Sequence, residues 1–268
     1  MDNTAKRPQV RRIFELDFIR GILIFLMCLQ HLCWFFYRYL YCGIWNPEKI
    51  SDRFRNFGKL TNDILYRYPY NLTTMSIAWC LYFLMAGVSF TFSHNNYKRS
   101  AIIAVFFALV YIIAAVCQNF FDNPVILNFG IFLGYAFYIL LFQLIRKLPL
   151  WFHIVLTATL LALAICCQIL EFNFELNPLR WFDLSQDWNM GHLDEWLLMP
   201  SLFFYSLGFV LGRTVYKNKT SKLQPLNKWI VFKPVLWFSK HSMIIYVANI
   251  VFYPILFIVL TAIINGGL

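Results

Sequence analysis

Charged residues and cysteines are both scarce in this chain of 268 residues, and each shortage excludes a class of protein. Only 13% of the residues are Asp, Glu, Lys or Arg, against roughly 25% in a typical soluble domain, which argues against an ordinary cytosolic enzyme. The low charge also excludes a disordered chain and a coiled coil, since both are rich in charged residues. Seven cysteines are too few for a disulfide scaffold, a class with more than about 8–10% cysteine.

Apolar residues, in contrast, make up 60% of the chain, and aromatic residues make up 20%. They gather in about seven runs of roughly 20 residues, the length of an α-helix that crosses a hydrocarbon core about 30 Å thick. We therefore predict an all-α fold, a polytopic integral membrane bundle that forms one domain over residues 1–268. The predicted spans are Ile13–Phe36, Thr74–Ser93, Ala101–Phe121, Val125–Ile145, Leu150–Leu170, Trp196–Gly212 and Ser242–Ile264.

Two apolar segments need a separate interpretation. The first run is too long for a cleavable signal and no small-residue cleavage site follows it, so we expect it to persist as a span. Trp229–Phe238 is too short to cross the membrane and contains Lys233-Pro234. We expect this segment to lie at the membrane interface or to re-enter from one side.

The net charge of +10 comes mainly from basic residues at the ends of the apolar runs, as the positive-inside rule requires of cytoplasmic loops. This pattern predicts a cytoplasmic tail at residues 1–12 and a cytoplasmic basic loop at residues 213–241. Residues 37–73 and 171–195 then form extracytoplasmic loops, and the C-terminus lies outside. The predicted partner is the lipid bilayer, and the same charge distribution argues against nucleic acid.

Three polar side chains in the first predicted span are candidates for a functional site, because such groups are costly inside a membrane. Asp17 and Arg20 stand at i and i+3, close enough to pair on one helix face. His31 follows Arg20 by almost three helical turns, which places it on the same face about 16 Å further along the helix. The ordinary structural interpretation, an interface anchor and a hydrogen-bonded bundle histidine, fits this spacing equally well.

Two further groups of polar residues are candidates for binding a substrate. The acidic loop that precedes the sixth span contains Trp188, His192 and Asp194; aromatic faces stack on sugar rings, and carboxylates bind hydroxyls or amines. In the last span, Tyr246 and Asn249 belong to one polar stripe. The alternatives are a solvated loop for the first group and hydrogen bonding between helices for the second. We predict no metal site.

Several blocks of sequence resemble a known family. The first span reads Arg12…Asp17-Phe18-Ile19-Arg20-Gly21…Met27…His31. It is similar to the opening helix of the membrane acyltransferases, and most similar to bacterial members of the heparan-α-glucosaminide N-acetyltransferase family, which is related to the acyltransferase-3 proteins. Phe83–Phe90, Asp194–Arg213 and Lys240–Tyr246 resemble later blocks of that family, in the same order.

The resemblance implies transfer of an acetyl or similar acyl group from acyl-coenzyme A, held from the cytoplasmic side, to an extracytoplasmic carbohydrate or amino sugar. It also implies a location in the bacterial cytoplasmic membrane. His31 and Asp17 are then the predicted catalytic residues, with the imidazole as the base that deprotonates the acceptor. The coenzyme A diphosphate requires cations near the inner face, and four residues are the candidates: Arg20, Arg213, Lys240 and His241.

Two positions depart from the family pattern, because Leu133 and Asn249 stand where many bacterial relatives have histidine. A second hypothesis therefore stays open: a non-catalytic membrane protein of the same fold, either a solute or lipid transporter or a subunit of an envelope-polysaccharide assembly. The sequence does not decide between O- and N-transfer. It is compatible with a homodimer.

Overall fold

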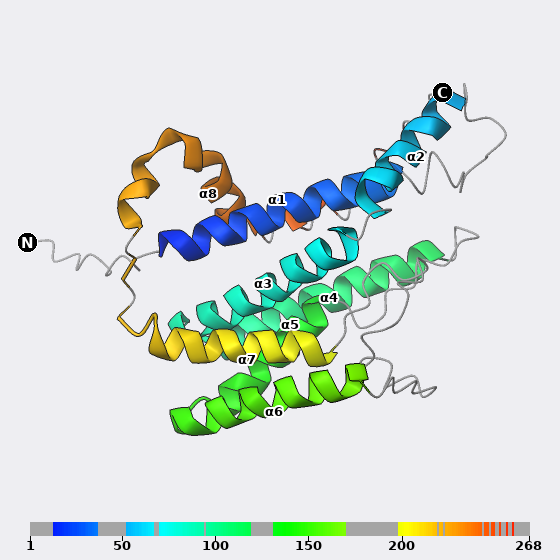
Figure 1. Cartoon of the computed structure of the whole chain (residues 1–268). Helices are drawn as coiled ribbons and strands as arrows, with labels where there is room; N and C mark the ends of the chain where they lie inside the picture. Colours follow the sequence, from blue (N-terminus) through cyan, green and yellow to red (C-terminus); the bar gives the residue numbers. More distant parts are fainter. Residues whose placement is uncertain are drawn as a thin grey trace, which may run out of the picture. The chain divides into compact units, whose positions relative to one another are not determined.

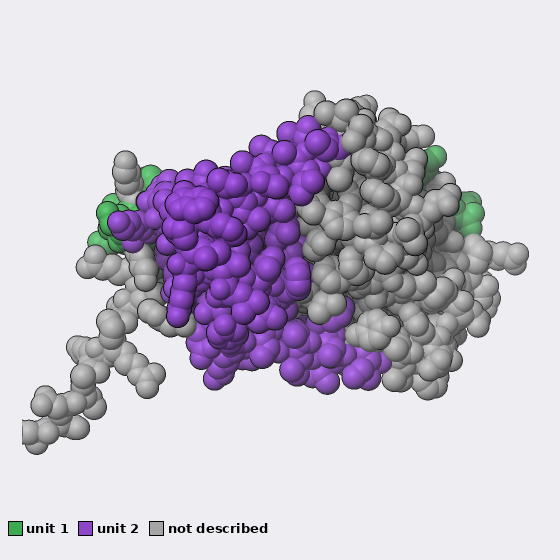
Figure 2. Space-filling model, turned by 90° about the horizontal axis from the view of Figure 1, so that it is seen from below, with its two compact units in different colours: residues 1–78, 218–268 green, residues 79–217 purple. Residues whose placement is uncertain are grey.

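The structure is a computed structural model, and every regular element in the residues that it describes is a helix (Figure 1). The described residues are 13–36, 52–66, 70–93, 95–118, 131–169, 198–218, 220–221, 223–242, 244–246, 248–249, 252, 256 and 259. The chain divides into two compact units, coloured separately in Figure 2. Unit 1 comprises residues 1–78 and 218–268, and unit 2 comprises residues 79–217. The all-α prediction is confirmed for the described part of the chain.

Unit 1 is built around α1 (Phe14–Phe36), a continuous helix of 23 residues. Its apolar sequence contains no proline, and Glu15 and Asp17 in the first turn stabilise the positive end of the helix dipole. The unit also contains α2 (Asp52–Tyr66), the first turns of α3 (Tyr70–Phe92), and, later in the chain, two short 3₁₀ helices followed by α8 (Lys233–Lys240). The 3₁₀ helices are η4 (Gln224–Lys228) and η5 (Ile230–Phe232).

Helix α8 lies against the N-terminal half of α1 (Figure 1). The ring of Phe232 meets the ring of Phe18 edge-on, with 5.3 Å between centroids, and Phe25 and Phe238 make a similar contact at 5.6 Å. Between these contacts the two backbones approach each other at Gly21. A Cβ atom on Gly21 would lie 2.0 Å from the carbonyl oxygen of Val235, so only glycine permits this approach.

Unit 2 contains two helix pairs and the larger part of α3. The first pair is α4 (Asn96–Gln118) with α5 (Ile131–Ile145), and the second is α6 (Leu150–Ile169) with α7 (Leu198–Thr214). Large aromatic side chains that are less than 2% exposed fill its core, namely Phe83, Phe90, Tyr138, Phe142, Tyr205 and Phe209. Their rings pack mostly edge-on or tilted, the favourable geometry for aromatic pairs.

Two glycines let α3 and α7 approach each other closely within unit 2. A Cβ atom on Gly87 would lie 2.1 Å from the carbonyl oxygen of Tyr205, and one on Gly208 would lie 2.0 Å from that of Leu84. Small residues at such contacts are typical of helix pairs in membranes, where packing rather than the hydrophobic effect drives association.

One helix among the described residues is long and apolar enough to cross a membrane, over Phe14–Cys33. Three shorter apolar helices accompany it, over Cys80–Phe92, Gly134–Ile145 and Leu150–Cys166. Helices α1 and α3 to α7 overlap the first six predicted spans within the described residues. Seven complete spans therefore stay a prediction, and residues 122–124, which connect the third and fourth predicted spans, lie outside the described residues.

The structure differs from the sequence-based expectation in the predicted loop at residues 37–73, which contains α2 and the first turn of α3. Helix α2 is polar on average, and its apolar residues recur every three or four positions, at Phe54, Phe57, Leu60 and Ile64. A search for long apolar runs misses such an amphipathic helix. The ring of Phe57 packs edge-on against Phe36, with 5.2 Å between centroids, and so joins α2 to the end of α1.

Candidate functional site

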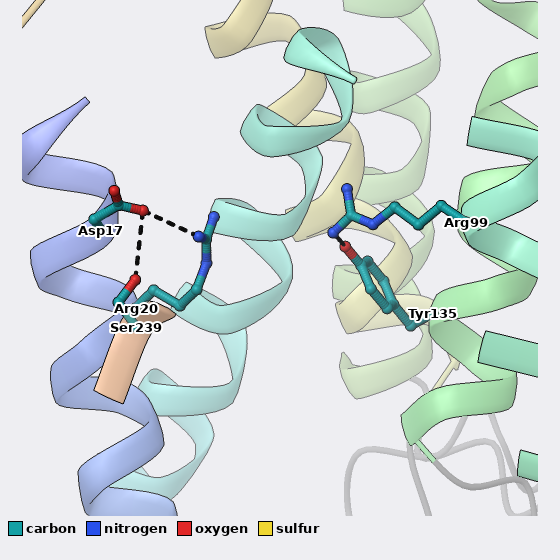
Figure 3. Close-up of polar contacts among 5 residues, drawn as sticks. All are labelled: Asp17, Arg20, Arg99, Tyr135 and Ser239. Atoms are coloured by element: carbon teal, nitrogen blue, oxygen red, sulfur yellow. Dashed lines mark hydrogen bonds and ion pairs between the residues drawn. The ribbon is translucent and has the colours of Figure 1, made fainter. Parts of the chain in front are cut away.

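The acid and the cation of α1 form the pair that their spacing predicts (Figure 3). Nη1 of Arg20 donates to Oδ1 of Asp17 at 3.2 Å. The same oxygen accepts a hydrogen bond from Oγ of Ser239 in α8, at 3.4 Å. Asp17 therefore both holds the guanidinium and joins α1 to α8, a connection between residues 222 positions apart in the sequence.

The imidazole of His31 contacts the chain segment that follows α8. Nδ1 of His31 forms a hydrogen bond with Nδ2 of the Asn249 side-chain amide, at 2.5 Å. The ring of Tyr246 stands edge-on to the imidazole, with 6.4 Å between centroids. Tyr246 and Asn249 are both buried, each 5% exposed. The structure thus brings together one predicted catalytic residue and two residues that the sequence assigned to substrate binding.

The four cations predicted to bind the donor diphosphate have different surroundings. Arg20 is half-buried and paired with Asp17, whereas Lys240 is exposed at the end of α8. His241 follows Lys240, and its Nδ1 donates to the carbonyl oxygen of Trp237 at 3.0 Å, which satisfies a carbonyl at the end of the helix.

Arg213 belongs to unit 2, so its position relative to Arg20 is not defined. Nη1 of Arg213 donates to the carbonyl oxygen of Leu148 at 3.0 Å, and the guanidinium lies 5.6 Å from the centre of the Phe209 ring. These contacts join the end of α7 to the turn between α5 and α6. They are the interactions of an anchoring arginine, and binding of a donor diphosphate by Arg213 stays a prediction.

Three predicted substrate-binding residues, Trp188, His192 and Asp194, lie outside the described residues. The side chain of Leu133 lies outside them as well. Among the residues that are described, no group of three or more His, Cys, Asp and Glu side chains has the arrangement of a metal site.

A second arginine, Arg99, was not among the predicted site residues and lies inside unit 2. Arg99 of α4 donates through Nη2 to the hydroxyl of Tyr135 in α5, as Figure 3 shows. Tyr205 of α7 lies against Tyr135, with 6.3 Å between ring centroids, and its buried hydroxyl has no hydrogen-bond partner in the described part of the chain. The sequence signal is an arginine two residues before the predicted span Ala101–Phe121, but a search for long apolar runs leaves Arg99 outside the spans.

His153 is the other residue whose surroundings the sequence did not indicate. It stands in the first turn of α6 and is 0% exposed, with its ring 4.5 Å from that of Phe209. From the sequence, only its place near the start of the predicted span Leu150–Leu170 is evident. A buried histidine therefore exists in unit 2 as well as the half-buried His31 in unit 1.

The fold and the site define a helical protein in which one long apolar helix carries an acid–arginine pair and, three turns further, a histidine held by a second segment. The chain belongs to the family described as heparan-alpha-glucosaminide N-acetyltransferase, catalytic, whose family model matches residues 12–251. Members of this family are membrane proteins, and in general they use acetyl-coenzyme A as the donor. Neither the curated proteins nor the solved structures gave a significant match.

Proposed function

We propose that this protein is a membrane-embedded acyltransferase that moves an acetyl or similar acyl group from cytoplasmic acyl-coenzyme A to an extracytoplasmic carbohydrate or amino sugar. The observation that carries the proposal is His31, whose imidazole is held by Asn249 and Tyr246 on the helix that carries the Asp17–Arg20 pair. Membership of an acetyltransferase family supports the reaction class.

In the proposed reaction, Nε2 of His31 is the general base. The acceptor's amine or hydroxyl attacks the carbonyl carbon of the thioester while Nε2 accepts the proton that the attacking group loses. A C–N or C–O bond forms and the C–S bond breaks, with the electron pair leaving on sulfur. The imidazolium then returns the proton to that sulfur, which releases coenzyme A with a free thiol.

Arg20 is proposed to attract the donor diphosphate, and Asp17 to hold its guanidinium in place. Guanidinium groups suit this task because they stay charged and present several donors in one plane. Lys240, the last residue of α8, belongs to the same unit and adds positive charge, and His241 follows it. Arg20 is about 16 Å from His31 along α1 by the rise of the helix, so it supports donor binding rather than the chemistry at the imidazole.

The acceptor is proposed to bind at the outer face of a seven-span bundle with a cytoplasmic N-terminus. Trp188, His192 and Asp194 are the residues proposed to contact a sugar there, by stacking and by hydrogen bonds. Tyr246 is proposed to complete the pocket beside His31, since its ring already packs against the imidazole.

Reconstitution in lipid vesicles tests the proposal. Acetyl-coenzyme A with a labelled acetyl group is supplied at the face of the N-terminal tail, and glucosamine at the opposite face. We expect labelled N-acetylglucosamine together with one free coenzyme A thiol per product molecule, and His31→Gln is the matched variant that should not form it. If the parent protein transfers no acetyl group to glucosamine or to neutral sugars, the proposal is wrong and the non-catalytic alternative, a transporter or an assembly subunit, is favoured.

A further inference from the structure

The hydrogen bond between His31 and Asn249 joins two segments that are 218 residues apart. The bond is made by Nδ1, so Nε2 is the ring nitrogen that Asn249 does not contact. Tyr246 is placed one turn before Asn249 and packs edge-on against the same ring. The imidazole is therefore contacted by two buried side chains of one segment, and Asn249 is the partner that contacts it through a polar group.

The partner of Nδ1 decides what Nε2 can do. A neutral imidazole carries one proton, and the hydrogen bond made by one nitrogen sets the position of that proton. An asparagine amide can present either end to Nδ1, because its oxygen and its NH₂ group have nearly the same shape. With Nδ2 toward the ring, Nδ1 accepts and Nε2 carries the proton. With Oδ1 toward the ring, Nδ1–H donates and Nε2 keeps a lone pair.

We infer that Asn249 is a positioning residue, whose Oδ1 accepts from Nδ1–H of His31 and so keeps the lone pair of Nε2 available to the acceptor. The structure has Nδ2 as the amide atom beside Nδ1, while Oδ1 is buried and has no hydrogen-bond partner in the described part of the chain. Turning the amide exchanges its two ends without changing its shape and gives Oδ1 a partner in Nδ1–H. The purpose of this arrangement rests on the proposed transfer reaction, since only a base requires that lone pair. The position of the proton is a property of the protein alone and is measurable without any substrate.

Nitrogen NMR of histidine reports the position of the proton directly. The chain has five histidines, so the protein is labelled with ¹⁵N-histidine in detergent and the His31 signals are assigned by their loss in His31→Gln. We expect a protonated Nδ1 and an unprotonated Nε2 in the parent protein. Asn249→Leu should move the proton wholly or partly to Nε2. Asn56→Leu makes the same change at an exposed position of α2 and should leave the His31 signals unchanged.

A second pair of variants tests the catalytic purpose. Aspartate is isosteric with asparagine and can only accept when ionised, so Asn249→Asp should keep the Nδ1–H form and retain most of the turnover. Asn249→Leu should lower kcat by about 10²-fold, as expected when a reacting group is misplaced, with little change in KM for acetyl-coenzyme A. A merely structural role predicts that both variants lose activity in proportion to their loss of folded protein.

The outcomes separate this inference from the proposed function. An unprotonated Nδ1 in the parent protein, or His31 signals that do not respond to Asn249→Leu, overturns the inference even if acetyl transfer is observed. Conversely, an Asn249-dependent proton position in a protein that transfers no acetyl group contradicts the proposed function and leaves the contact itself established.

Discussion

At the scale of single residues, Asp17 connects α1 to α8, because one of its oxygens accepts hydrogen bonds from both Arg20 and Ser239. The pair is only partly buried: the side chain of Arg20 is 26% exposed and that of Asp17 is 16% exposed. The contribution of this pair to the free energy of folding therefore lies between that of a surface ion pair and that of a fully buried one.

Replacing Asp17 by Asn should destabilise the protein more than replacing both members of the pair. Asp17→Asn leaves the charge of Arg20 without its carboxylate, and we expect a loss of about 1–3 kcal/mol, in the range for hydrogen bonds to charged groups. The double variant Asp17→Asn with Arg20→Met removes the charge of Arg20 as well, so part of the stability should return. Thermal unfolding in detergent measures the stability of the single and of the double variant. A double variant that loses the sum of the two single effects would show that the pair does not interact energetically.

A similar prediction follows from the Arg99–Tyr135 contact in unit 2. Tyr135 is 6% exposed, so Tyr135→Phe removes a hydrogen bond from a guanidinium that lies among aromatic rings. We expect the stability to fall by about 1–3 kcal/mol. Tyr97→Phe is the matched control, because Tyr97 precedes Arg99 by two residues and is 52% exposed. Equal unfolding temperatures for the two variants would contradict a stabilising role for this contact.

At the scale of elements, the position of α8 depends on the absence of a side chain at Gly21. A Cβ atom there would lie 2.0 Å from a backbone oxygen of α8, which cannot move without the helix. Gly21→Ala should therefore displace α8 or strain it, at a cost of about 1–3 kcal/mol, as is usual for overpacking.

Protease sensitivity of the segment around α8 and the unfolding temperature are the two measurements for Gly21→Ala. We expect faster cleavage and a lower unfolding temperature than in the parent. Ala162→Val adds apolar volume at an exposed position of α6 and should change neither. If Gly21→Ala changes neither the cleavage rate nor the unfolding temperature, α1 and α8 do not approach each other closely at Gly21.

The sequence predicted the elements that depend on local properties. The apolar run that begins at Ile13 gives α1 almost to the residue, and the i, i+3 spacing gives the Asp17–Arg20 pair. Helix α2 was not predicted, because its sequence signal is the periodic recurrence of apolar residues in a polar segment rather than a long apolar run. The contact between His31 and Asn249 could not be predicted, because it depends on how α1 packs against a segment more than 200 residues later. The helical spacing of Tyr246 and Asn249 indicated a polar stripe but not its partner.

At the scale of the whole molecule, the central expectation is a bundle of seven spans that begins in the cytoplasm and ends outside. The length of the apolar runs and the basic residues at their ends support this topology. Alkaline phosphatase fused to the C-terminus should be active, because it folds only outside the cytoplasm, whereas a fluorescent protein in the same place should be dark. A bright fluorescent fusion with an inactive phosphatase fusion would require an even number of spans.

The proposed transfer depends on one imidazole, so the most direct measurement compares His31→Gln with the parent protein. Both are purified in detergent, and their affinity for coenzyme A and their turnover with acetyl-coenzyme A and an amino sugar are determined. We predict nearly equal affinities and a kcat at least about 10²-fold lower in the variant, the usual contribution of a general base. A variant that binds coenzyme A normally and transfers acetyl groups at the parental rate would contradict the account, because the base would then lie elsewhere.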